Sequence, residues 1–451
     1  MSDNLVIIGV GGTGAKIVEA VVHLAATGDA PLNIYPVLID QDLHNGNVQR
    51  TREAIKRYKI IQDSLEGIES KWIFKSTLNK IDDRLLPLVP EEPNNSFNAA
   101  IGYAGMSSSE RKVMQSLFNT NQREEILDKG YKKRANMGSV IFNSLLQKED
   151  QKDDTTPGLN MIISALSAVS NPDIVIAGSL FGGTGASGIT NVGKFLRSKI
   201  PGANVKGLLM LPYFTVSNEY NDDDPDAGLV RSDSDMQLVK VALDIYREEM
   251  ESTFHSIMLV GSQTDKIQNE NATSISESGG ETQLNPAHIF ELIAATAALQ
   301  DFPTSDNTAY YQYSADSKEQ IPDYSFETLP ASINKTRFNL LRDFVSTVLS
   351  ANTHKKSWKK RQPWYPNNKE EFNKLFNWAV RYDEWIREMS QRGSHSHVWR
   401  KFNFKDEPSE VVYKLGSKLS INMAAKKANK VSDILKSLNG LSVKSEIERS
   451  I

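Results

Sequence analysis

The chain has 451 residues with 39% hydrophobic content, which is enough for two or three globular domains and a substantial core. Its formal net charge of -4 at pH 7 gives no overall attraction to nucleic acid, and zero cysteines exclude disulfides, cysteine-ligated zinc and thiol catalysis. The sequence starts without a signal-peptide pattern and contains no run of about 18 apolar residues. We therefore expect a cytoplasmic protein without a membrane span.

The first predicted element is a strand that leads through a glycine loop into a helix. Residues 5–8 are apolar, residues 9–14 form a glycine-rich turn, and residues 15–24 have helical spacing. Such a turn lets the backbone approach a phosphate chain. Taken alone the pattern is weak, because similar turns open dinucleotide-binding folds of many kinds. The candidate contacts are Gly11, Gly12, Thr13 and Gly14.

A second strand is predicted at residues 34–39, and polar side chains follow its carboxyl end. Acidic residues in this position commonly contact a ribose hydroxyl or a hydrated metal ion. An ordinary solvated loop explains the same pattern equally well. The candidates are Asp40, Gln41 and Asp42.

Residues 101–112 contain two glycines and three serines before a helical run. This arrangement is typical of a helix start that binds an anion, and it is equally typical of a plain helix cap without a ligand. If the segment binds a ligand, the candidate contacts are Gly105, Met106 and Ser107.

The strongest pattern in the chain lies at residues 173–188. An apolar, β-branched run predicts a strand, and glycine then occupies four of the seven positions from 182 to 188 before a helix begins. Backbone amides and hydroxyl groups can hold a phosphate chain there. No lysine follows in the Gly-Lys-Ser/Thr arrangement, which excludes a Walker P-loop. The candidate contacts are Gly182, Gly183, Thr184, Gly185, Ala186 and Ser187.

Both glycine loops contain Gly-Gly-Thr-Gly between a strand and a helix, so they can face one phosphate chain from two sides at the edge of a parallel sheet. With this pair, the chain resembles the tubulin/FtsZ superfamily of polymerising GTPases, in the style of its divergent bacterial members. Residues 181–188 look like the superfamily's signature Gly-Gly-Gly-Thr-Gly-Ser/Thr-Gly, with Phe181 and Ala186 as departures. The resemblance covers roughly residues 1–300 and fades after that.

The resemblance implies an α/β fold with a Rossmann-type parallel sheet. It places a tubulin/FtsZ-like nucleotide-binding domain at 1–283, a central buried helix at 284–302 and a C-terminal domain at 303–451. Helical spacing at residues 332–352 and 370–392 makes this last domain mostly helical.

The resemblance also implies ligands and roles: GTP or GDP with Mg²⁺, and self-association into filaments. We further expect protein partners at the C-terminal domain. Phe290 would stack on the base and Glu291 would accept a hydrogen bond from its edge, although both also suit core and rim positions. Asp301 and Asp306 would orient the attacking water across a subunit contact. The superfamily's usual Asn-x-Asp-x-x-Asp order is absent here.

Three functions stay open on the sequence. The first is a self-assembling GTPase, and the second is a non-hydrolysing, nucleotide-switched scaffold that recruits partner proteins. The third, a Rossmann-type dinucleotide enzyme, is disfavoured because the second glycine loop would have no role in it. A basic cluster at 355–361 is the one place suited to nucleic acid, and a solvated loop is the better explanation of it.

Overall fold

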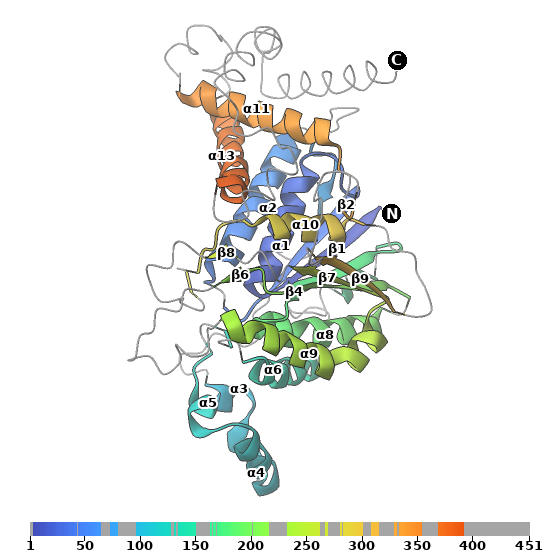
Figure 1. Cartoon of the computed structure of the whole chain (residues 1–451), viewed down its shortest axis with the longest axis vertical. Helices are drawn as coiled ribbons and strands as arrows, with labels where there is room; N and C mark the ends of the chain where they lie inside the picture. Colours follow the sequence, from blue (N-terminus) through green and yellow to red (C-terminus); the bar gives the residue numbers. More distant parts are fainter. Residues whose placement is uncertain are drawn as a thin grey trace.

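A computed structural model shows a main parallel sheet with helices on both sides (Figure 1), which confirms the predicted α/β class. The residues that it describes are 3–42, 44–64, 73–79, 96–127, 130–131, 134–149, 163–164, 166–167, 169–200, 202–215, 232–261, 267–268, 280–281, 283–300, 308–314, 329–331, 333–353 and 369–391.

The main sheet has seven strands in the order β3-β2-β1-β4-β5-β7-β9, and every neighbouring pair is parallel. Strands such as β1 and β4 are continuous apolar runs because helices cover both of their faces. A separate parallel pair consists of β6 (Phe214–Thr215) and β8 (Ile267–Gln268). The bounds of the seven strands are Asn4–Val10 (β1), Asn33–Ile39 (β2), Thr77–Leu78 (β3), Asp173–Ser179 (β4), Asn204–Met210 (β5), Ser256–Gly261 (β7) and Ala309–Ser314 (β9).

The strand order reverses between β1 and β4. From β1 the chain moves outward through β2 and β3, and from β4 it moves outward in the opposite direction. In open α/β sheets, ligands bind at such a switch point, in the crevice outside the carboxyl ends of the strands.

Two helical layers enclose the sheet. One contains α1 (Gly11–Ala25), α2 (Gly46–Ser64) and α10 (Ile289–Ala298). The other contains α6 (Ala135–Glu149), α8 (Gly183–Lys199) and α9 (Ser232–Thr253), with α8 packed against both of its neighbours. The helices α1 and α8, which follow the two glycine loops, therefore lie on opposite faces.

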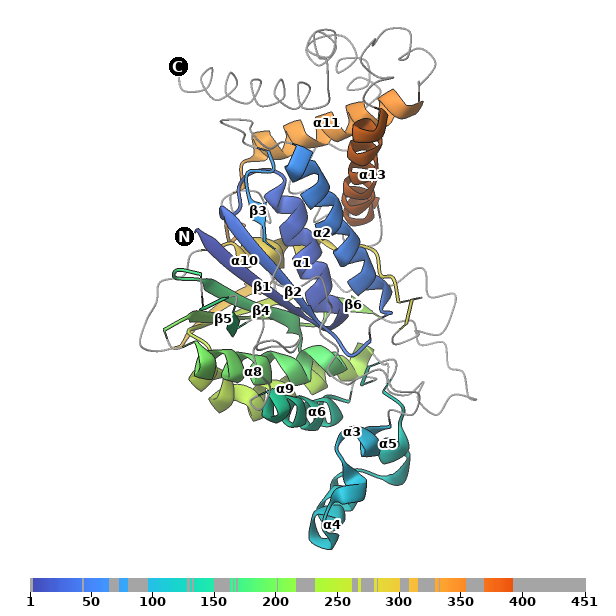
Figure 2. The same cartoon turned by 180° about the vertical axis from the view of Figure 1, so that it is seen from behind.

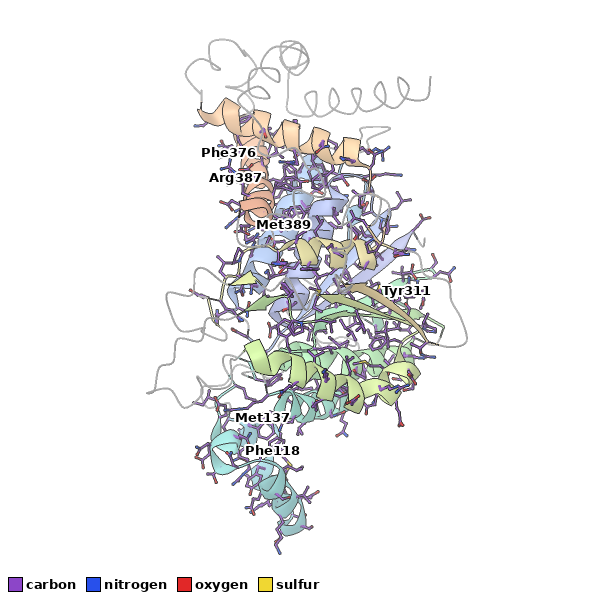
Figure 3. All side chains as sticks on the ribbon, in the orientation of Figure 1. Phe118, Met137, Tyr311, Phe376, Arg387 and Met389 are labelled. Atoms are coloured by element: carbon purple, nitrogen blue, oxygen red, sulfur yellow. The ribbon has the colours of Figure 1, made fainter. Side chains whose placement is uncertain are left out.

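Short helices between β3 and α6 form a unit that projects from the body (Figures 1 and 2). A bridge between Ser96 and Ile126 closes this unit. Inside it the side chain of Phe118 (Figure 3) packs on Phe97, with ring centroids 4.8 Å apart. The unit comprises α3 (Phe97–Ala100), a 3-10 turn (Tyr103–Gly105), α4 (Ser108–Leu117) and α5 (Thr120–Glu124).

Two C-terminal helices, α11 (Lys335–Thr353) and α13 (Lys369–Gln391), lie at one end of the body near α1 and α2 (Figure 2). They begin and end within a few residues of the predicted spans. An aromatic contact joins α13 to α1: His23 of α1 stacks on Trp385 of α13, with ring centroids 4.7 Å apart.

The domain boundary predicted at residue 303 does not separate these elements. Strand β9 lies beyond it, yet pairs with β7 as the edge strand of the main sheet. The buried apolar residues of α11 and α13 also belong to the same continuous core as those of the sheet. The described parts of 303–451 therefore extend the domain that contains the main sheet, because they pack on its edge and on α1 and α2.

The central buried helix is shorter than the predicted span of 284–302. Helix α10 begins at Ile289, because His288 caps it and Glu291 completes the capping box. The imidazole Nδ1 of His288 accepts a hydrogen bond from the Phe290 N–H at 3.0 Å. Within the described residues, no helix has the length and apolar character needed to cross a membrane.

Candidate functional site

The two glycine loops lie side by side at the switch point of the sheet. Strands β1 and β4 are neighbours, with Gly9 in register with Ala177. Each strand runs directly into its helix, and neither cap position, Val10 or Gly182, supplies a side-chain acceptor. The first N–H groups of α1 and α8 therefore meet at one edge, an arrangement suited to an anion.

Glycine is needed where the loops touch. Gly11 has a φ of 74°, and a β-carbon there would lie 3.3 Å from the amide nitrogen of Gly185. A β-carbon at Gly14 would lie 2.4 Å from the carbonyl oxygen of Ala177 in the neighbouring strand. The loops can approach this closely only because both positions lack side chains.

Four loop residues remain partly open to solvent: Gly12 and Thr13 in the first loop, and Gly182 and Gly183 in the second. Ser187 is buried inside α8, where its hydroxyl donates to the Gly183 carbonyl at 2.7 Å. Ala186 is buried as well. The surface offered to a ligand is thus mainly backbone.

Asp40 reaches from the end of β2 to the second glycine loop. Its Oδ1 accepts hydrogen bonds from Thr184 Oγ1 and from the Asp42 N–H, both at 3.3 Å. The residue is 3% exposed, and burial raises the pKa of Asp40 to about 7 despite these donors. A buried carboxyl that titrates near neutral pH therefore lies where the two loops meet.

Tyr131, which the sequence analysis did not select, lies near the same carboxyl. Burial, followed by the charge of Asp40, raises the pKa of Tyr131 well above its ordinary value. The neighbouring Gly130 approaches Thr184, since a β-carbon there would lie 3.7 Å from Thr184 Oγ1. Among the described residues the Tyr131 hydroxyl has no hydrogen-bond partner. Leaving such a group unsatisfied costs about 1–3 kcal/mol, so a ligand atom that bonds to it would stabilise the site.

The Asp42 carboxylate holds another segment of the chain beside the loops. It accepts hydrogen bonds from the N–H groups of His44 and Gly280. Gln41 is buried, and its Oε1 has no hydrogen-bond partner among the residues described.

Amide side chains that the sequence analysis also missed surround the first loop. A β-carbon at Gly12 would lie 3.4 Å from the side-chain nitrogen of Asn45, which donates to Gln283 Oε1 at 2.6 Å. Asn47 and Asn285 are joined by two hydrogen bonds, of 3.0 and 2.9 Å. These contacts fix residues 283–285 against the start of α2. They join segments far apart in the chain, so no local pattern reveals them.

Phe290 and Glu291 lie in the interior. Phe290 is fully buried and stacks on His288, with ring centroids 5.4 Å apart. Glu291 is 1% exposed, forms an ion pair with Lys16 and accepts a hydrogen bond from Tyr213 at 2.6 Å. Contact with a base would require this packing to rearrange, and their predicted base-binding roles remain predictions.

Gly105, Met106 and Ser107 lie on the projecting unit, away from the glycine loops (Figure 1). Ser107 caps α4, and the Ser107 N–H donates a hydrogen bond to the Glu110 carboxylate at 2.7 Å. The plain helix cap is thus the interpretation that describes Ser107. Gly130 lies beside Thr184 instead, and Tyr131 lies near Asp40.

The predicted catalytic acids, Asp301 and Asp306, lie outside the described residues. Within the part of the chain that the structure describes, no three His, Asp or Glu side chains group together as metal ligands.

The sequence matches no protein-family model and no curated protein.

Proposed function

We propose that this chain binds a nucleoside triphosphate, with its phosphates held between the N-termini of α1 and α8. The meeting of the two glycine loops carries the proposal, since a β-carbon at Gly11 would lie 3.3 Å from the Gly185 nitrogen. Two helix N-termini with accessible backbone amides together favour a multiply charged anion. The resemblance of residues 181–188 to the tubulin/FtsZ signature supports GTP as the nucleotide.

Asp40 supports a divalent cation in this proposal. A carboxylate beside a phosphate chain repels it, and the pKa of about 7 leaves much of Asp40 ionised at neutral pH. Proteins commonly bind Mg²⁺ through one or two carboxylates together with phosphate oxygens. Asp40 and the Thr184 hydroxyl, which are 3.3 Å apart, suit this role. The ion would neutralise charge on the phosphates.

Calorimetric titration with Mg-GTP, Mg-ATP and NAD tests the proposal. Gly12→Ala places a methyl group over the accessible loop, where its nearest neighbours are the side chains of Asn45, at 3.4 Å, and Asn47, at 3.5 Å. We expect a loss of about 10- to 150-fold in GTP affinity, as for one charge-assisted hydrogen bond of about 1.5–3 kcal/mol. Gly105→Ala is the matched control, because a β-carbon there meets nothing within 4 Å. Equal affinity in the two variants would contradict the proposal.

Asp40→Asn tests the cation separately. Without Mg²⁺, the variant should bind GTP about tenfold or more tightly than the parent chain, because the repulsion is gone. With Mg²⁺ the variant should no longer bind GTP more tightly than the parent chain, because the ion loses the Asp40 carboxylate as a ligand. Asp42→Asn is the control, because the Asp42 carboxylate is engaged by backbone N–H groups instead. The same Mg²⁺ dependence in all three proteins would remove Asp40 from the metal role.

The resemblance further supports slow GTP hydrolysis activated by self-assembly. Phosphate release per subunit that rises steeply with protein concentration would support this part of the proposal. Tight binding without release at any concentration would favour the nucleotide-switched scaffold instead.

One observation favours a dinucleotide as the second candidate ligand. Gly9, Gly11 and Gly14 have the Gly-x-Gly-x-x-Gly spacing of dinucleotide folds, and Asp40 ends the second strand as in those folds. Such a ligand would leave the N-terminus of α8 unused, and Asp40 contacts that loop through Thr184. Binding of NAD in preference to GTP would establish this candidate and refute the first.

A further inference from the structure

Two buried asparagine side chains lie beside Gly12 in the first glycine loop. A β-carbon at Gly12 would lie 3.4 Å from the side-chain nitrogen of Asn45 and 3.5 Å from that of Asn47. Both asparagines are 3% exposed, whereas Gly12 itself is partly open to solvent. The two nitrogens therefore border the place where a ligand can reach the N-terminus of α1.

Backbone contacts fix which atom of each side-chain amide is the nitrogen. Asn45 directly precedes α2, and its Oδ1 accepts hydrogen bonds from the N–H groups of Asn47 and Val48, at 3.0 and 3.4 Å. The Oδ1 of Asn47 accepts a hydrogen bond from the Asn285 N–H at 2.9 Å. A backbone N–H can only donate, so the atoms that accept these bonds are the oxygens. The atoms nearest to Gly12 on both side chains therefore include a nitrogen donor.

Each of these nitrogens has one hydrogen engaged and one available. A side-chain amide nitrogen carries two hydrogens. Asn45 donates one of them to Gln283 Oε1 at 2.6 Å, and Asn47 donates one to Asn285 Oδ1 at 3.0 Å. The second hydrogen of each nitrogen has no partner among the residues that the structure describes. A ligand oxygen that accepts it would remove the cost of a buried donor without a partner.

We propose that Asn45 and Asn47 are ligand-binding residues that donate hydrogen bonds to a phosphate at the first glycine loop. The proposal rests on the proposed function, because the acceptor is an oxygen of the phosphate chain at the N-terminus of α1. A phosphate oxygen carries negative charge and accepts several hydrogen bonds, which suits two amide donors beside free backbone N–H groups. Lys16 does not take this role, since its ammonium pairs with Glu291 and donates to the Pro286 carbonyl.

Calorimetric titration of the full chain with Mg-GTP, and with inorganic triphosphate and Mg²⁺, tests the proposal. Asn45→Ser removes the nitrogen and keeps a side-chain oxygen that can accept from the first turn of α2. Asn119→Ser is the matched control, because Asn119 caps α5 on the projecting unit in the same way. Gln283→Ala is a second control, because it removes the partner of Asn45 and leaves the Asn45 amide in place.

Both ligands should bind about tenfold or more weakly to Asn45→Ser than to the parent chain, as expected for one hydrogen bond to a charged group. Asn119→Ser and Gln283→Ala should bind both ligands as the parent chain does. Asn47→Ser should show the same loss as Asn45→Ser, and it serves if Asn45→Ser does not fold. Its control is Asn285→Ala, which removes the side-chain partner of Asn47.

Unchanged affinity in Asn45→Ser would overturn the proposal. An equal loss in Asn45→Ser and Gln283→Ala would overturn it too, because Asn45 would then act only by holding residues 283–285. A loss confined to GTP, or a parent chain that binds GTP but not triphosphate, would place the amides against the sugar or the base and refute the phosphate contact. A parent chain that binds neither ligand would overturn the proposed function itself.

Discussion

Asp40→Asn should stabilise the ligand-free protein at pH 8 relative to the parent chain and lose that advantage as the pH falls. The Asp40 carboxyl is 3% exposed at the meeting of the two loops, and burial raises its pKa from an ordinary 3.8 to about 7. Between these two pH values the unfolded chain has released the proton and the folded chain retains it. Folded-state stability therefore falls as the pH rises from about 4 to 7, and the loss is complete above pH 7.

The size of the effect follows from the difference of about 3 pKa units, which corresponds to about 4 kcal/mol at high pH. About 3 kcal/mol of this accumulates between pH 5 and pH 8. Asparagine cannot ionise, so the variant escapes the penalty. Its amide has one oxygen fewer to accept hydrogen bonds from the Asp42 N–H and the Thr184 hydroxyl, at a cost of about 1–3 kcal/mol that does not depend on pH.

Urea unfolding of both proteins at pH 5, 6, 7 and 8, without nucleotide, measures the difference directly. Other titrating groups cancel, because both chains contain them. The free energy of unfolding of the variant minus that of the parent should rise by about 3 kcal/mol from pH 5 to pH 8 and then level off. A difference that stays constant over the four pH values would refute the assignment of a buried, titrating carboxyl to this position.

Gly14→Ala should destabilise the fold by about 3 kcal/mol or more, because the new methyl group would lie 2.4 Å from a backbone carbonyl oxygen. A melting temperature as high as that of Gly105→Ala would contradict this. Arg50→Met should lower the free energy of unfolding in urea by about 3–5 kcal/mol, because it leaves the buried Glu19 carboxylate without the guanidinium that pairs with it. An unchanged urea midpoint would show that the Arg50–Glu19 ion pair does not contribute to stability. Burial lowers the pKa of His23, so the parent chain should lose stability relative to His23→Phe as the pH falls below 6.5. Parallel stability curves of the two proteins would contradict this.

The parts of the site that the sequence predicts are those in which one short segment determines its own structure. Residues 173–188 combine an apolar strand, a run of glycines and a helical pattern, and they form β4, the loop and the start of α8 as expected. The same holds for the first loop. Their meeting could also be anticipated, because a parallel sheet gathers the carboxyl ends of its strands at one edge.

Contacts between distant segments decide the rest. Tyr131 has no local pattern, and it belongs to the site only because α6 packs on α8. Pro286 is typical of a helix start, but its carbonyl accepts a hydrogen bond from Lys16. Helix α10 begins only after the cap residue His288. The sequence places β9 in a separate, mostly helical domain, because the six residues of this strand do not show that the edge of β7 is free to pair with them.

The central claim is that both helix N-termini hold one phosphate chain. A high-resolution structure of the protein with Mg²⁺ and a slowly hydrolysed GTP analogue tests it most directly. Phosphate oxygens should lie within about 3 Å of backbone nitrogens in both glycine loops, at Gly12 and at Gly183. Phosphates that contact only one loop, or a nucleotide bound elsewhere on the protein, would contradict the account.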